Sequence, residues 1–154
     1  MRSIAVIAFL VLLVPQFANA SEYDLEDVDL VSPEMVQSLD TEGVRTTLDL
    51  LKQLLTSEQR SAFAARAQLD EASVKELAIR LELMQLAGVG AKAAALLNAA
   101  GVRSCADLAS RDAATLLELL LTTNAEKAIT GKDPDQLVVA DWIEKAKTAS
   151  IRLE

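Results

Sequence analysis

The sequence contains no histidine and a single cysteine, Cys105, and these two shortages exclude whole classes of site. Without histidine there is neither a His-ligated metal site nor acid–base catalysis by imidazole. A lone cysteine cannot form an intramolecular disulfide. Because Cys105 begins a predicted helix beside Ala106 and Leu108, a small buried thiol is favoured over a reactive or intermolecular one. We expect no metal site and no cofactor.

Aromatic residues, prolines and glycines are also scarce. Aromatics make up 3% of the 154 residues, beside three prolines and five glycines, so the core must be built from Leu, Val, Ile and Ala. The length suffices for one domain with its own core. No stretch shows the alternation of a half-buried strand. The sequence therefore predicts an all-α fold, a compact bundle of about seven to eight short helices.

Acidic residues are absent from the first 20 positions, which have the pattern of an export signal. Met1-Arg2-Ser3 precedes an unbroken apolar run from Ile4 to Val14, and Ala18-Asn19-Ala20 follows Pro15. A membrane-spanning helix needs about 20 apolar residues, so the run is too short for an anchor. We therefore expect a signal peptide over 1–20, cleaved after Ala20, and an exported bacterial protein, periplasmic or secreted, without a membrane anchor.

Runs of lysine or arginine are absent as well. The expected mature chain has 14 basic and 23 acidic residues, a formal charge of −9, which repels nucleic acid and anionic membranes at long range. Acidic residues are dense in 21–31, which we interpret as a flexible acidic leader with Tyr23 or Leu25 able to dock on the domain.

The stretch 83–108 is the most informative part of the chain. An apolar helix end is followed by Gly88-Val89-Gly90 and then by an alanine-rich helix from Ala91. Glycine at both turn positions suits a backbone that needs a positive φ or very close packing. Val89 can then point between the two helices. The stretch therefore predicts a backbone reversal that clamps two helices together.

An internal repeat links two parts of the chain. GVRTTLDL at 43–50 matches GVRSCADL at 101–108, so Gly43 and Gly101 each end a helix. Thr or Ser then caps the next helix, with Asp49 or Asp107 completing a variant capping box. In this register Gly88-Val89-Gly90 falls on Leu30-Val31-Ser32, so the first copy is degenerate.

Capping residues mark the other helices. The last helix carries Trp142, which we expect to fill the core. One helix is predicted to begin at Pro33 after the cap Ser32, a second runs from Thr56 to Ala67, and a third from Asp70 to Leu86. A fourth covers Ala113–Leu121, with Ser110 as its cap and its leucines in the core. A connector over 124–132 follows, and the last helix covers Leu137 to about Ala149 and is opened by Asp133 to Gln136.

Two resemblances follow from these residues. The turn resembles a helix-hairpin-helix motif, whose apolar, glycine, alanine and leucine positions are filled by Leu86, Gly88, Val89, Gly90, Ala94 and Leu97. Residues 32–149, ending in Trp142-Ile143-Glu144-Lys145-Ala146, resemble an uncharacterised bacterial family, a domain of unknown function with two such units in tandem. The resemblance implies a compact helical fold and no established activity. Residues 150–154 form a tail.

Two functions from different classes fit the sequence. The first is a non-catalytic helical module that binds a protein partner through an exposed apolar stripe. The alternative is weak binding of a nucleic-acid phosphate backbone by Gly88, Val89, Gly90, Ala91 and Lys92, as the helix-hairpin-helix resemblance and exported DNA-uptake receptors imply. The acidic charge opposes it, since Lys92 and Arg103 are the basic residues near the turn. Gly43, Gly88, Gly90, Gly101 and Trp142 are otherwise structural.

An enzyme is the least favoured class. With no histidine, catalysis would need carboxylates alone, and no spacing places two of them around a pocket. Asp49 and Asp107 already have a structural explanation in the first turns of helices. We therefore expect no catalytic residue.

Overall fold

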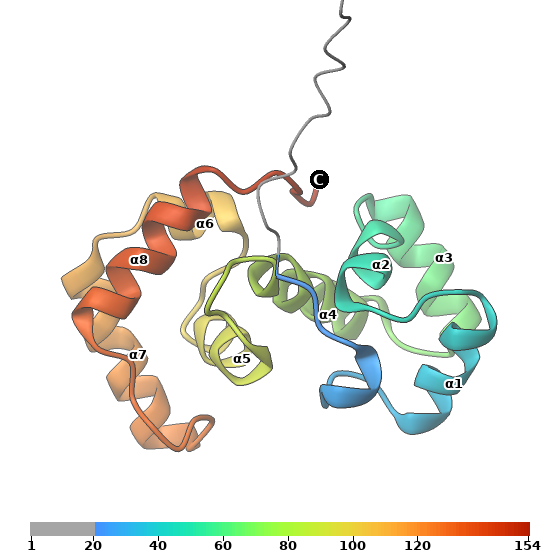
Figure 1. Ribbon diagram of the computed structural model, residues 1–154, viewed down its shortest axis with the longest axis horizontal. Coiled ribbons are helices and arrows are strands. Elements are labelled where there is room, and N and C mark those ends of the chain that lie inside the picture. Colours follow the sequence, from blue (N-terminus) through green and yellow to red (C-terminus); the bar gives the residue numbers. More distant parts are fainter. Residues whose placement is uncertain (1–20) are drawn as a thin grey trace, which may run out of the picture.

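The computed structural model describes residues 21–154, so the predicted signal peptide lies outside the described residues. Within them the chain forms eight α-helices and one short 3-10 helix, with no strand beyond a single bridge between Asp24 and Thr46 (Figure 1). The predicted all-α fold of seven to eight helices is confirmed. The elements are η1 Leu25–Asp27, α1 Pro33–Thr41, α2 Thr47–Lys52, α3 Ser57–Ala67, α4 Glu71–Met84, α5 Ala91–Ala99, α6 Cys105–Ala109, α7 Ala113–Lys127 and α8 Gln136–Lys147.

The eight helices form two units of four, and in both units the last helix packs against the two before it. In the first unit α4 packs against α2 and α3, and in the second α8 packs against α6 and α7. Each unit has its own hydrophobic core, and the contact between α4 and α5 joins them. Helix α4 serves both cores, with Val74 and Leu77 in the first and Leu83 and Met84 in the second. It therefore lies at the centre of the molecule (Figure 1).

The sequence repeat corresponds to a repeated turn after α1 and after α5. Gly43 and Gly101 have φ of +79° and +89°, a conformation that favours glycine. Val44 and Val102 follow them, are buried, and donate backbone hydrogen bonds of 2.9 and 3.0 Å to residues 39 and 97. The two turns thus bury an equivalent valine at the same place in each unit.

The helix caps after these turns differ in one respect. Thr46 and Asp49 exchange hydrogen bonds in a full capping box at the start of α2. At the start of α6 the Ser104 hydroxyl accepts from the Asp107 N–H at 3.0 Å, but the Asp107 carboxylate accepts from the N–H of Arg103 instead. The same carboxylate is paired with Arg111, and this pair with the bond from Arg103 lowers its pKa. The second box is therefore only half formed.

The boundaries of α7 differ from those predicted. Its N-cap is Asp112 rather than Ser110, which instead caps the C-terminus of α6. The helix continues to Lys127, well past Leu121, so part of the predicted connector is helical. Helices α4 and α8 in turn end two residues before their predicted ends.

The buried stripe of α7 explains this difference. Leu116 and Leu120 are buried, whereas Leu119 and Leu121 are 41% and 38% exposed, so the leucine cluster is only partly core. Thr123 and Asn124 continue the stripe of Leu116 and Leu120 at helical spacing and are also buried. The Asn124 side chain bonds both backbone groups of Thr130. A polar residue therefore extends the helix where an apolar one would be expected.

Both ends of the described chain pack on the helices. In the segment 21–31, Leu25 is buried and its N–H donates to the carbonyl of Arg45, while the carbonyl of Tyr23 accepts from Thr47. In the tail, the N–H of Glu154 donates to the carbonyl of Leu55. The leader and the tail, although at opposite ends of the sequence, therefore both pack against the first core, and side chains of both also pack against the second.

Candidate functional site

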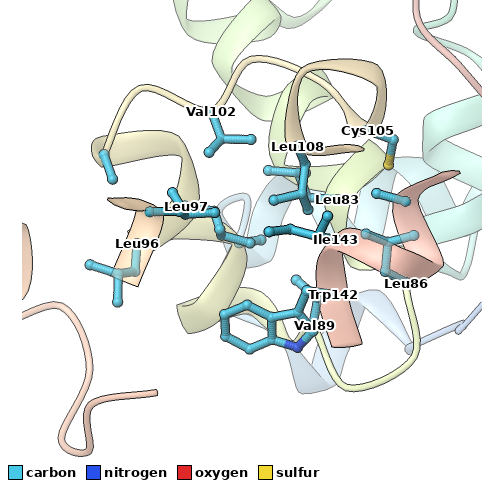
Figure 2. Packing of buried hydrophobic residues seen from close by; sticks show 14 of the residues in the cluster. Leu83, Leu86, Val89, Leu96, Leu97, Val102, Cys105, Leu108, Trp142 and Ile143 are labelled. Atoms are coloured by element: carbon cyan, nitrogen blue, oxygen red, sulfur yellow. The ribbon is translucent and has the colours of Figure 1, made fainter. Parts of the chain in front are cut away.

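The turn between α4 and α5 reverses the chain as the sequence predicts. Gly88 has a φ of +89°, and Val89 is fully buried with its N–H donating to the carbonyl of Leu86 at 2.9 Å. Figure 2 shows Val89 and Leu86 beside Trp142 and Ile143 of α8, in the core of the second unit. Trp142 is 5% exposed. The turn is thus fixed by a glycine conformation and by a buried valine.

Gly90 does not have the role that the sequence suggested. Its φ of −84° and ψ of −179° are open to any residue, and a Cβ added there would meet no atom within 4 Å. The expectation that both turn glycines serve the backbone geometry therefore holds for Gly88 and fails for Gly90. A side chain at Gly90 would be accommodated.

Helix α5 differs from the other described α-helices at its first turn. At Gly90 no side chain accepts a hydrogen bond from the helix. Each of the other seven is capped by a side chain, from Ser32, Thr46, Thr56, Asp70, Ser104, Asp112 or Asp135. The backbone N–H groups in the first turn of α5, near Ala91, are thus available to an anion, and so is the exposed side chain of Lys92. The helix dipole favours an anion at this end of the helix.

The basic residues around the turn are arranged differently from the prediction. Arg103 bonds Glu76 at 2.9 Å and the side chain of Asn98, so its charge is already paired. Lys145 of α8 instead donates to the carbonyl of Ala87 at 2.9 Å and pairs with Asp141. Sequence reasoning missed Lys145 because it lies 58 residues from the carbonyl that it contacts.

An acidic groove lies between η1 and α1. Its volume is about 640 Å³, and its wall combines carboxylates with apolar side chains. Four of the five acidic residues take part in no ion pair among residues 21–154; the fifth, Asp40, pairs with Arg45. The acidic groove is lined by Glu26, Asp27, Asp29, Glu34 and Asp40, and by Leu25, Val28, Val31, Pro33, Val36 and Gln37.

The electrostatics of this groove favour cations. Hydrogen bonds from its own backbone N–H and from Ser32 lower the pKa of Glu34 and so stabilise its charged form. Leu25, the first residue of η1, is buried, and its N–H donates to the carbonyl of Arg45. This bond holds the η1 side of the groove against the first unit. The sequence places these residues across a leader and a helix, so their assembly into one groove was not predicted.

A buried polar cluster joins α4, α6 and the tail. Glu82 is fully buried, and its carboxylate accepts from the N–H groups of Cys105 and Leu153. Burial raises the pKa of Glu82, although both hydrogen bonds and Arg152 act in the opposite direction. Burial also raises the pKa of the Cys105 thiol, and the Glu82 charge adds to that effect. Cys105 is therefore a buried thiol, as the sequence favours, and we expect it to be unreactive in the folded protein.

Two features are absent from the described part of the chain. Residues 21–154 hold no group of three or more His, Cys, Asp or Glu side chains placed to bind a metal ion. Nor does any helix there combine the length and hydropathy needed to cross a membrane.

Comparison with protein families gives one match. A model described as a domain of unknown function (DUF4332) matches residues 30–149, more than half of the chain. The chain belongs to the DUF4332 family. The DUF4332 region contains all eight α-helices and the turn at 88–90, but it leaves η1 outside and includes only the α1 side of the acidic groove, with Glu34 and Asp40. No curated protein and no solved structure matches the chain.

Proposed function

We propose that this protein is an exported, non-catalytic helical module that binds a basic, amphipathic segment of a partner protein. The observation that carries the proposal is the acidic groove between η1 and α1, whose lining combines unpaired carboxylates with apolar side chains in one hollow of about 640 Å³. Such a wall complements a segment with Lys or Arg on one side and aliphatic residues on the other.

The charge of the groove supports a basic partner. Glu26, Asp27 and Asp29 are exposed and have no ion-pair partner within the described residues. A cationic segment would therefore gain attraction without displacing an existing pair. Charge at a rim mainly raises the association rate and makes it sensitive to salt. The apolar part of the wall, including Val31 and Val36, supplies the area that a charged surface alone lacks.

A pair of matched variants tests this function. In the groove variant Glu26→Gln, Asp27→Asn and Asp29→Asn remove three charges; in the control variant Glu58→Gln, Glu118→Gln and Glu126→Gln remove three exposed charges elsewhere. Cross-linking to the proteins of the exported compartment should yield a basic protein with the wild type and the control. The groove variant should capture less than about a tenth as much, as expected when clustered charges act together. Equal capture by both variants would refute the proposal.

Export is part of the same proposal. It is supported by the apolar run from Ile4 to Val14 and the small residues Ala18 and Ala20. The intact mass of the protein recovered from the producing bacterium should correspond to a chain that begins at Ser21. A full-length chain that stays with the cytoplasm would show that export is wrong.

A second candidate is binding of a nucleic-acid phosphate through the helix-hairpin-helix-like turn. The specific observation is the uncapped start of α5, with Lys92 on that helix and Lys145 against the carbonyl of Ala87. The formal charge of −9 opposes it at long range, whereas a local contact between a lysine and a phosphate is strongest at low salt. A low-salt gel shift with duplex DNA should show retention that Lys92→Glu abolishes. Gly90→Ser, whose hydroxyl would occupy the free N–H groups, should weaken it as well, and retention unaffected by both variants would exclude this site.

A further inference from the structure

A second cavity lies on the other side of the segment 30–32, between the start of α1 and α4. Its volume is about 550 Å³, within the range of sites that hold small organic molecules. The wall is mainly aliphatic, and one of its side chains, Leu69, is 40% exposed. One cationic residue, Arg80 of α4, completes it. The residues that matter to the inference are Leu30, Val31, Met35, Leu69, Leu77 and Arg80.

Arg80 is unsatisfied in this wall. The guanidinium Nε atom is buried and has no hydrogen-bond partner, and the residue forms no ion pair with any described residue. Buried polar atoms in proteins are nearly always hydrogen-bonded, so this Nε–H in a half-buried side chain is an exception. Burial lowers the pKa of Arg80, and the charge of Asp29 opposes that shift only in part. The Arg80 side chain thus has a donor without an acceptor and a charge without an ion-pair partner among the described residues.

The other polar side chains of the cavity are already engaged. The Ser73 hydroxyl donates to Asp70, and Ser32 accepts from the N–H of Met35 at the start of α1. The Glu76 carboxylate accepts from Asn98 and Arg103. Arg80 is therefore the polar side chain of this wall with hydrogen bonds left to donate.

We propose that this cavity binds an organic monocarboxylate with an aliphatic body. The carboxylate bonds the planar guanidinium of Arg80, and the hydrocarbon is buried against Leu30, Met35 and Leu77. A single negative charge fits better than a phosphate because Glu76 lines the same wall and Asp29 is close enough to influence Arg80. This site is separate from the acidic groove, although Val31 contributes to both walls.

The test uses decanoate as the probe and the mature chain with ¹³C-methyl methionine. Two methionines remain in residues 21–154: Met35 lines the cavity, and Met84 is buried in the core of the second unit. Decanoate should move the Met35 methyl signal in a saturable way and leave Met84 in place. Decanol and decyltrimethylammonium, which lack the carboxylate, should produce a much smaller shift at Met35. A Met35 signal that does not respond to decanoate would overturn the proposal.

Variants of α4 provide an independent arm. Arg80→Gln should weaken decanoate binding at least about tenfold, while Lys75→Gln, the same charge change on an exposed residue of the same helix, should leave it unchanged. Circular dichroism of both variants checks that they fold. Should Arg80→Gln not fold, the decanoate–decanol comparison in the wild type decides the question alone. Equal affinity of Arg80→Gln and Lys75→Gln for decanoate would show that Arg80 is not the anchor.

Discussion

The carboxylate of Glu82 accepts a 2.8 Å hydrogen bond from the backbone N–H of Cys105, the first residue of α6. Its second oxygen accepts from the N–H of Leu153 in the tail at 3.4 Å. One fully buried side chain on α4 therefore ties together the central helix, the second unit and the C-terminal segment. Both donors depend on that carboxylate.

Removal of this side chain should be strongly destabilising. Glu82→Ala leaves the buried N–H of Cys105 without an acceptor, at a cost of about 1–3 kcal/mol, removes the acceptor of the partly buried N–H of Leu153, and also leaves a cavity. Urea unfolding should show a loss of at least about 2 kcal/mol, whereas the exposed control Glu118→Ala should change stability by less than about 0.5 kcal/mol. Similar stabilities for the two variants would contradict the role assigned to Glu82.

The same residue should make stability depend on pH. Because burial raises the pKa of Glu82, the folded state holds this proton more tightly than the unfolded chain. That contribution is complete below the ordinary pKa of glutamate, about 4.3, and is lost as pH rises through the folded-state pKa. The wild type should thus lose stability relative to Glu82→Gln as pH rises from about 4 to 8. The difference between the two proteins isolates Glu82 from carboxylates with lowered pKa such as Asp70 and Asp112. A difference independent of pH would contradict the assignment.

Cys105 should resist alkylation until the protein unfolds. The thiol is completely buried, and burial together with the Glu82 charge raises its pKa, so thiolate is scarce at neutral pH. Mass spectrometry should detect no iodoacetamide adduct in native buffer and one adduct in urea. Rapid modification of a protein whose circular dichroism remains native would show that α6 is more open than described here.

The two turn glycines should respond differently to the same substitution. Gly88→Ser forces a side chain into φ of +89° and should cost about 1–2 kcal/mol. Gly90→Ser meets open space and adds a hydroxyl cap to α5, so it should stabilise the protein by a few tenths of a kcal/mol. Thermal unfolding of both variants provides the comparison. Equal losses at the two positions would mean that the turn conformation is different.

Much of the fold could be predicted because its signals are local. A glycine, a buried valine and a capping Thr or Ser recur at 43–46 and 101–104, and each acts within a few residues. Such signals specify where helices end and which side chain points inward. They also explain why Thr56 and Ala67 mark the cap and the end of α3 as predicted.

The residues of the candidate sites escaped prediction because their roles depend on distant contacts. Glu82 contacts Cys105 and Leu153, which lie 23 and 71 positions later in the sequence. Lys145 contacts the turn from α8. Helix α4 lies between two cores, so a polar face that would normally meet solvent is covered. Arg80 on that helix is half-buried beside Leu30 and Met35, which lie about 50 residues earlier in the sequence. Hydrophobic periodicity describes one buried face and does not reveal a second.

Chemical-shift mapping with a basic amphipathic peptide, such as a helical repeat of lysine and leucine, tests the proposed function most directly. Amide signals of the ¹⁵N-labelled mature chain should shift in and around the acidic groove, at residues 25–40, and the shifts should diminish as salt is added. The turn at 88–92 and helix α7 should be unaffected. Shifts centred on 88–92, or none at 25–40 at low salt, would contradict the account.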